Sequence, residues 1–248
     1  MSILLEICAD SVESAVIAQE AGAGRIELCC NLAEGGTTPS YGTISSARNN
    51  LRIKLNVLIR PRSGDFLYSD EEFDIMRRDI EICGELGADG IVTGILNPGG
   101  TIDVDRTARL VEIAYPMTVT FHRAFDMCVD PVDGLEDIIA TGADRLLTSG
   151  LKNRAADSVE IIRQLIIQAG SRLTIITGGG IDETNVAKII EMTGAKEVHL
   201  TGRKEIDSEM IFRRKEVNLG SGTPSSEFSR KIADHEKISN IVALLKMF

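Results

Sequence analysis

The chain repeats one unit along most of its length: a short β-rich run, a polar or glycine-containing loop, and a stretch typical of helix. Strands that alternate with helices in this way form βαβ units, which build parallel sheets. Glycine–alanine pairs such as Gly87-Ala88 and Gly142-Ala143 mark helix ends just before a strand. The eight predicted strands are Ile3–Cys8, Arg25–Cys29, Lys54–Arg60, Gly90–Ile95, Met117–His122, Asp144–Thr148, Leu173–Thr177 and Glu197–Leu200.

Eight strands in 248 residues predict a closed TIM-type (β/α)8 barrel. Because a strand count does not show closure, an open doubly wound sheet is the alternative. No linker or shift in composition divides the chain, so we expect residues 1–248 to form one domain. The rhythm breaks over Lys204–Ser229, which includes a predicted loop at Gly220–Ser226, and a C-terminal helix is predicted over Ser229–Lys246.

The charge balance and the cysteine content restrict the partners and the compartment. The formal net charge is −10, with 37 acidic against 27 basic residues, which disfavours nucleic acid and anionic membranes as partners. No apolar run approaches the roughly 20 residues that span a bilayer, and the first residues do not resemble a signal peptide. Five cysteines, an odd number in a chain of this size, predict reduced thiols and a cytoplasmic location.

Several predicted strands place polar side chains on the face that should point into the barrel. Side chains alternate along a strand, so the apolar positions of each run assign the polar ones to the interior. Barrel interiors are mostly aliphatic, and buried charges must pair with one another or with a ligand. An internal ion-pair network without chemistry is therefore the alternative to a functional site. The inward set is Glu6, Cys8, Glu27, Cys29, Asn56, Arg60, Thr120, His122, Glu197 and His199.

Three loops after the predicted strands carry groups suited to a small anion. Arg60 and Arg62 follow the third strand, and guanidinium groups bind oxyanions through paired hydrogen bonds. His122 ends the fifth strand. Gly179 and Gly180 follow the seventh strand, where barrels often bind phosphate through backbone N–H groups. A tight strand-to-helix turn is the alternative explanation for these glycines.

Six segments together resemble the CutC family of copper homeostasis proteins. Ser63 is a mild departure, because a glycine often stands there in the family. The resemblance implies a TIM-type barrel, a cytoplasmic location, self-association as a homo-oligomer and a connection to copper. The matching segments are Glu6–Glu13 (EICADSVE), Arg25–Cys29 (RIELC), Glu34–Ser40 (EGGTTPS), Ile59–Phe66 (IRPRSGDF), Thr118–Asp126 (TVTFHRAFD) and Leu147–Gly150 (LTSG).

The first functional hypothesis is Cu(I) binding by Cys8 and Cys29, which match the family cysteines associated with that ion. Both lie at the ends of adjacent predicted strands with the same inward parity. Neighbouring strands are about 4.8 Å apart, so two thiolates could reach one soft ion. The alternative is a pair of small buried hydrophobic side chains, the usual role of free cysteine.

The second hypothesis is an enzyme or sensor for a small phosphorylated or otherwise anionic metabolite at the C-terminal mouth. Arg60 and Arg62 are the expected principal donors, with Gly179 and Gly180 as backbone contributors. For proton transfer, His122 is the first candidate and Glu27 the second. The sequence assigns no reaction, and a barrel fold does not specify one.

Overall fold

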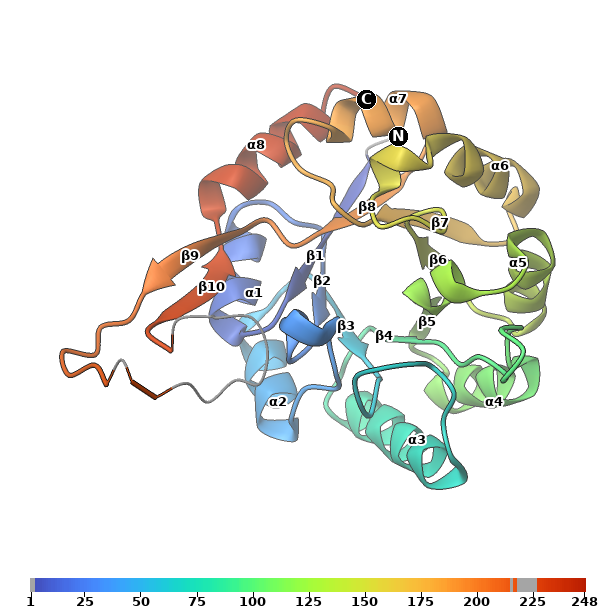
Figure 1. The fold of residues 1–248 in the computed structure, drawn as a ribbon, viewed down its shortest axis with the longest axis horizontal. Helices are drawn as coiled ribbons and strands as arrows, with labels where there is room; N and C mark the ends of the chain where they lie inside the picture. Colours follow the sequence, from blue (N-terminus) through green and yellow to red (C-terminus); the bar gives the residue numbers. More distant parts are fainter. Residues whose placement is uncertain (1–2, 215, 218–226) are drawn as a thin grey trace.

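The computed structural model describes residues 3–214, 216–217 and 227–248. Within these residues, eight parallel strands close into a barrel in the order β1 to β8, which confirms the predicted TIM-type fold and excludes the open sheet (Figure 1). The strands are β1 (Leu4–Ala9), β2 (Arg25–Leu28), β3 (Lys54–Leu58), β4 (Gly90–Thr93), β5 (Thr118–Phe121), β6 (Arg145–Thr148), β7 (Thr174–Gly178) and β8 (Glu197–Leu200).

Helices surround the barrel as an outer ring (Figure 1). Their starts are set by local chemistry: at Ser69 the side chain and Glu72 form a reciprocal capping box, and Asp130 caps a helix that begins with Pro131. The helices are α1 (Val12–Glu20), α2 (Tyr41–Asn50), α3 (Asp70–Glu85), α4 (Val104–Ala114), α5 (Pro131–Ala140), α6 (Val159–Ala169), α7 (Val186–Thr193) and α8 (His235–Leu245).

The register of β8, β1 and β2 brings the polar positions of three strands together. Glu6 pairs with His199 on one side, and Cys8 pairs with Glu27 on the other. Between them on the same strands, Ile7 and Ile26 are fully buried members of the apolar core that the helices cover. The predicted alternation is therefore confirmed for these strands, and it concentrates polar side chains inside the barrel.

The C-terminal region differs from the prediction of one long helix over Ser229–Lys246. Ser229–Ala233 is a strand, β10, which pairs antiparallel with β9 (Arg203–Asp207), and helix α8 begins only at His235. Asp234 accepts a hydrogen bond from the N–H of Glu236 and so starts the helix after the strand. The predicted loop Gly220–Ser226 lies outside the described residues.

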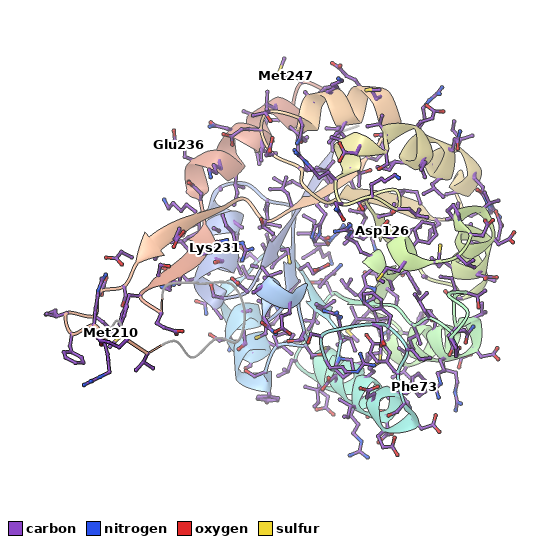
Figure 2. The ribbon with its side chains drawn as sticks, viewed as in Figure 1. Phe73, Asp126, Met210, Lys231, Glu236 and Met247 are labelled. Carbon is purple, nitrogen blue, oxygen red and sulfur yellow. The ribbon has the colours of Figure 1, made fainter. Side chains whose placement is uncertain are left out.

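The β9–β10 hairpin projects away from the barrel (Figure 2). Met210 lies at its far end, whereas Asp126 lies inside the ring of helices. Beside Met210, the side chain of Ile211 is fully exposed. Among the described residues, the structure contains no helix with the length and apolar character needed to cross a membrane.

Candidate functional site

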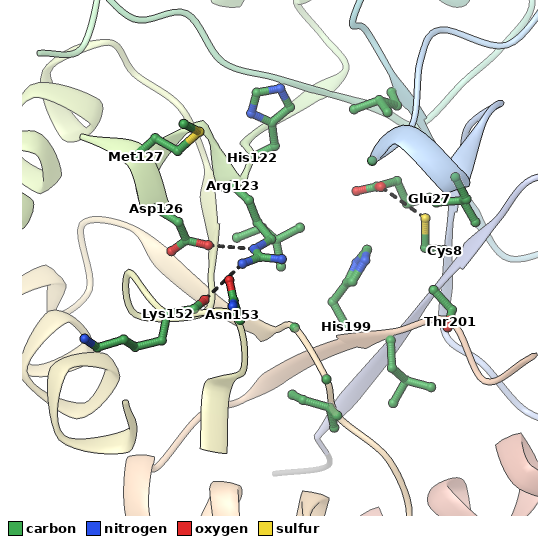
Figure 3. A pocket seen from close by; sticks show the side chains of 18 of the residues that line it. Cys8, Glu27, His122, Arg123, Asp126, Met127, Lys152, Asn153, His199 and Thr201 are labelled. Atoms are coloured by element: carbon green, nitrogen blue, oxygen red, sulfur yellow. Dashed lines mark hydrogen bonds and ion pairs between the residues drawn. The ribbon is translucent and has the colours of Figure 1, made fainter. Parts of the chain in front are cut away.

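A cavity of about 680 Å³ opens where the strands end, at the mouth of the barrel (Figure 3). Residues from β1, β2 and β8 line one side of it, and residues that follow β5, β6 and β7 line the other. This is the end of the barrel at which TIM-barrel enzymes bind their substrates. Of the residues predicted to form a site, the cavity is lined by Cys8, Glu27, Arg60, His122, Gly179 and Gly180.

The two predicted metal-binding thiols are in contact. The Sγ atoms of Cys8 and Cys29 lie 3.7 Å apart, and the thiol of Cys8 also donates to Oε1 of Glu27 at 3.4 Å. Cys8 lines the cavity, whereas Cys29 is fully buried behind it and packs against Leu58. The hydrogen bond with Cys29, burial and the charge of Glu27 raise the pKa of Cys8 well above its ordinary value. Cys8 is therefore kept as a neutral thiol.

His199 completes this cluster from the neighbouring strand β8. One ligand atom from each of Cys8, Glu27 and His199 lies within 4.8 Å of the others, a spacing that fits a shared metal ion. Nδ1 of His199 lies 2.7 Å from Oε1 of Glu6. Burial opposes charge on His199, but Glu27 and Glu6 outweigh it and raise the pKa of the imidazole well above its ordinary value. The sequence placed His199 inside the barrel but did not identify it as a ligand.

Below this cluster, the interior contains a charged network that joins strands β1, β2, β6 and β8. Arg25 pairs with both Glu6 and Glu197, and Arg145 lies 3.4 Å from Glu197. Burial acts to raise the pKa of Glu6, but the hydrogen bond from His199 and the charge of Arg25 hold it at about 2. The alternative of an internal ion-pair network without chemistry thus describes the lower residues of the inward set, Glu6 and Glu197. Cys8, Glu27 and His199 remain on the cavity.

The two arginines predicted to bind an anion have separate environments. Arg60 lines the cavity, but its guanidinium donates to the carbonyl oxygens of Glu34 at 3.0 Å, Gly36 at 2.7 Å and Gly64 at 2.7 Å. It thereby ties the loop after β2 to the loop after β3. Of the three guanidinium nitrogens of Arg60, Nε is the one without a hydrogen-bond partner among the described residues.

Arg62 is not among the residues that line the cavity. Its Nε donates to Glu72 at 2.6 Å, and its Nη2 donates to Asp65 at 2.9 Å and to the Leu67 carbonyl at 2.7 Å. These acceptors fix the loop after β3 against the start of α3. The structure therefore does not bring Arg60 and Arg62 together on the cavity.

His122 is a neutral imidazole at the cavity wall. Its Nδ1 accepts a hydrogen bond from the N–H of Ala124 at 3.2 Å, so the proton resides on Nε2. Burial and the nearby charge of Arg60 lower its pKa to about 3. Nε2 has no partner within the described part of the chain. This state suits a hydrogen-bond donor better than a proton acceptor.

Glu27 has the properties that His122 lacks for proton transfer. Burial, reinforced by the negative charge of Glu6, raises the pKa of the Glu27 carboxyl despite the opposing charge of His199. Its Oε2 has no hydrogen-bond partner among the residues that the structure describes. Of the two predicted catalytic residues, Glu27 is therefore better suited to exchange a proton with a bound molecule.

Gly179 and Gly180 lie at the other side of the cavity with backbone φ angles of +99° and +65°. A Cβ on Gly179 would come within 2.9 Å of the Cβ of Ser149, so a side chain does not fit there. The carbonyl of Gly179 accepts from the N–H of Ala155 at 2.9 Å. The turn explanation for these glycines therefore holds, and it is compatible with a binding role.

A salt bridge between Arg123 and Asp126 stands beside these glycines, on a short 3₁₀ helix after β5 (Figure 3). Arg123 Nε donates to Asp126 at 2.6 Å, and Nη2 donates to Oγ of Ser149 at 2.6 Å. Both residues belong to the segment Thr118–Asp126 that carries the family resemblance, but the sequence did not predict this pairing. The nearby Lys152 also lines the cavity and was not predicted from the sequence.

Comparison with known proteins agrees with the sequence resemblance. The model of the CutC family matches residues 3–204. The copper homeostasis protein cutC homolog of Mus musculus is 46% identical over 243 residues, which cover 98% of this chain and 89% of the mouse protein. A CutC protein of Chromobacterium violaceum is 49% identical over 221 residues, covering 89% of this chain and 90% of that protein.

A solved structure shows the same fold at substantial sequence identity. The crystal structure of a CutC protein from Streptococcus agalactiae superposes with a TM-score of 0.76 and 37% identity, covering 79% of this chain and 97% of that one. The family match extends from β1 to the first residues of β9 and includes all the strands that form the cavity. The chain belongs to the CutC family.

Proposed function

We propose that this protein binds Cu(I) between Cys8 and Cys29 and that it acts in copper homeostasis. The observation that carries the proposal is the Sγ–Sγ distance of 3.7 Å between two thiols on adjacent strands. Thiolates are the ligands that Cu(I) prefers among protein side chains. The mouse relative, which is 46% identical, is named a copper homeostasis protein.

The distance between the sulfurs also indicates the coordination geometry. With metal–sulfur bonds of about 2.3 Å, sulfurs 3.7 Å apart subtend an angle of about 107° at the metal, whereas linear coordination needs about 4.6 Å. A bent pair leaves room for a third ligand. His199 is the best-placed donor, because Glu6 accepts the hydrogen bond of its Nδ1 and Nε2 becomes free for the metal once it loses its proton.

Metal binding must displace protons from this site. The pKa of Cys8 is raised in the ligand-free protein, so Cu(I) competes with the thiol proton. Glu27 accepts the hydrogen bond of that thiol and is the residue placed to receive the proton. Since Cys8 faces the cavity and Cys29 does not, the ion would enter along the side of Cys8.

A competition titration against a chromogenic Cu(I) chelator, on fully reduced protein, tests the proposal. We expect Cys8→Ser and Cys29→Ser each to weaken binding by ~100-fold or more, because each removes one of two thiolates. Cys83→Ser is the matched control, since Cys83 is equally buried but lies in α3. Equal Cu(I) affinity in the wild type and in both site variants would rule out the pair as ligands.

Two further properties stay predictions that rest on the family resemblance and on the chemistry of the pair. A reducing, cytoplasmic location would preserve two thiols that lie only 3.7 Å apart. Self-association as a homo-oligomer is the second. Light scattering coupled to size-exclusion chromatography of the reduced protein measures the number of subunits directly.

A further inference from the structure

The side of the cavity opposite the cysteines carries hydrogen-bond donors that metal binding does not use. The N–H groups of Gly179 and Gly180 have no acceptor among the residues that the structure describes. Both residues line the cavity, and both have positive φ. Consecutive free N–H groups in such a turn form a site that favours anions.

Two arginine side chains lie against these two glycines. The guanidinium carbon of Arg123 lies 3.6 Å from the position of a Cβ on Gly179, and Nε of Arg154 lies 3.1 Å from that position on Gly180. Lys152 lies on the same loop as Arg154 and lines the cavity, and its side chain extends away from Arg123 (Figure 3). Arg123 and Arg154 reach the glycines from the loops that follow β5 and β6, Arg123 on the cavity itself and Arg154 at its edge.

The donors of this cationic group are only partly used. Arg123 is fixed through Nε and Nη2, which leaves Nη1 without an acceptor in the described part of the chain. The side chains of Lys152 and Arg154 have no hydrogen bond or ion pair with any residue that the structure describes. In a protein with a net charge of −10, this is a local excess of positive charge.

Asp126, the carboxylate paired with Arg123, has its acceptors occupied within the fold. It accepts from Arg123 and from the hydroxyl groups of Thr148 at 2.5 Å and Ser149 at 2.8 Å. The N–H groups of Ser149 and Leu151 add three contacts of 3.1 Å. Asp126 therefore positions Arg123 and the loop after β6, while the remaining cations stay available for a ligand.

We propose that this side of the cavity binds the phosphate group of a small phosphorylated molecule, through the N–H groups of Gly179 and Gly180 and the side chain of Arg123. The exposed side chains of Lys152 and Arg154 would turn toward the bound anion. A phosphate monoester presents three acceptor oxygens and up to two negative charges. It can therefore use more of these donors than a ligand carboxylate, which has two oxygens and one charge. This assignment is independent of copper. It places the anion away from Arg60 and Arg62, whose guanidinium groups are held by the protein itself.

The size of the cavity indicates what accompanies the phosphate. A volume of about 680 Å³ lies within the range of sites for small molecules and is far larger than a phosphate ion requires. The cavity continues from the glycines to His122 and Glu27. The neutral His122 suits a hydrogen bond to a carbonyl or hydroxyl oxygen, so the ligand class is a phosphate ester of a polar, oxygen-bearing carbon chain.

The test is calorimetric titration of metal-free, reduced protein with inorganic phosphate and with glycerol phosphate as the monoester probe. The double variant Lys152→Met/Arg154→Met removes two exposed charges without disturbing a hydrogen bond of the fold. We expect it to raise the dissociation constant of both probes at least ~10-fold, because each lost contact to phosphate is charge-assisted. The monoester should bind more tightly than inorganic phosphate, since its carbon chain extends into the cavity.

The matched control is Arg52→Met/Lys196→Met, which removes the same charge from exposed positions at the start of β3 and β8, at the opposite end of the barrel. It should leave both dissociation constants within twofold of wild type. Absence of binding to the wild type at millimolar probe concentration would overturn the proposal. So would equal affinity of the Lys152/Arg154 variant and the wild type. Neither result bears on the Cu(I) titration, which uses a different ligand and different variants.

Discussion

Oε1 of Glu6 lies 2.7 Å from Nδ1 of His199, and both side chains are held inside the barrel by adjacent strands. This contact fixes the orientation of the imidazole ring, as carboxylates commonly do for metal-binding histidines. The second oxygen of Glu6 pairs with Arg25, which in turn pairs with Glu197. The orientation of a cavity residue therefore depends on the charged network below it.

Glu6→Gln should destabilise the fold. Glu6 is fully buried, and its loss as a charge leaves Arg25 with Glu197 as its remaining carboxylate. Breaking a buried ion pair from one side costs roughly 3 kcal/mol. Glu136→Gln is the control, because the Glu136–Arg172 pair is exposed and solvent screening leaves such pairs little effect on stability. Chemical denaturation of both variants measures the difference, and equal losses would contradict the role of the network.

The free energy of unfolding should fall on acidification, over a pH range set by the pKa values of Glu6 in the unfolded and folded states. The pKa of Glu6 is lowered in the folded state from 4.5 to about 2, so the unfolded chain takes up this proton at higher pH than the folded one. The stabilisation is fully present above about pH 4.5 and is lost as pH falls toward 2. Denaturation curves at several pH values should show a shallower acid dependence for Glu6→Gln than for wild type.

At alkaline pH the free energy of unfolding should fall as the pH rises, because His199 loses its proton. The pKa of His199 is raised well above 6.5 in the folded protein. Its contribution is fully present below about pH 6.5 and is lost as pH rises through the folded-state pKa. Replacing His199 by Gln should remove this loss of stability at alkaline pH. Identical pH profiles for the variant and the wild type would contradict it.

The barrel and its inward side chains could be predicted because both follow from short-range patterns. Period-two alternation placed Glu6, Cys8, Glu27 and His199 inside from single strands. The pairing of β9 with β10 could not be predicted in that way, because it joins segments separated by the stretch that breaks the repeat.

The individual partners of the polar residues were also beyond the sequence pattern. Arg60 was predicted to bind an anion, but the loops after β2 and β3 fold so that backbone carbonyls surround its guanidinium. The Glu6–His199 contact depends on closure of the barrel, which joins the first strand to the last. Both outcomes depend on loop conformation and strand register, which alternation along one strand does not specify.

If His199 is the third copper ligand, its replacement should change the coordination as well as the affinity. We expect His199→Ala to weaken Cu(I) binding by ~10- to 100-fold, a smaller loss than either cysteine variant gives. X-ray absorption at the copper edge should show sulfur with one nitrogen scatterer in the wild type and lose the nitrogen in the variant. Two sulfurs alone in wild-type spectra would exclude His199 while leaving the cysteine pair as the site.

Gly179→Ala should destabilise the protein through the backbone and through steric contact. Gly179 has a φ of +99°, and an added Cβ would lie 2.9 Å from the Cβ of Ser149, which is held by Asp126. A non-glycine residue in such a conformation costs about 1–3 kcal/mol. Gly99→Ala is the matched control, because no atom lies within 4 Å of its added Cβ and its φ is outside the restricted region. Its free energy of unfolding should stay equal or rise by up to about 1 kcal/mol. Thermal or chemical denaturation of the pair separates the outcomes, and equal stability of the two variants would mean that the turn after β7 accepts a side chain.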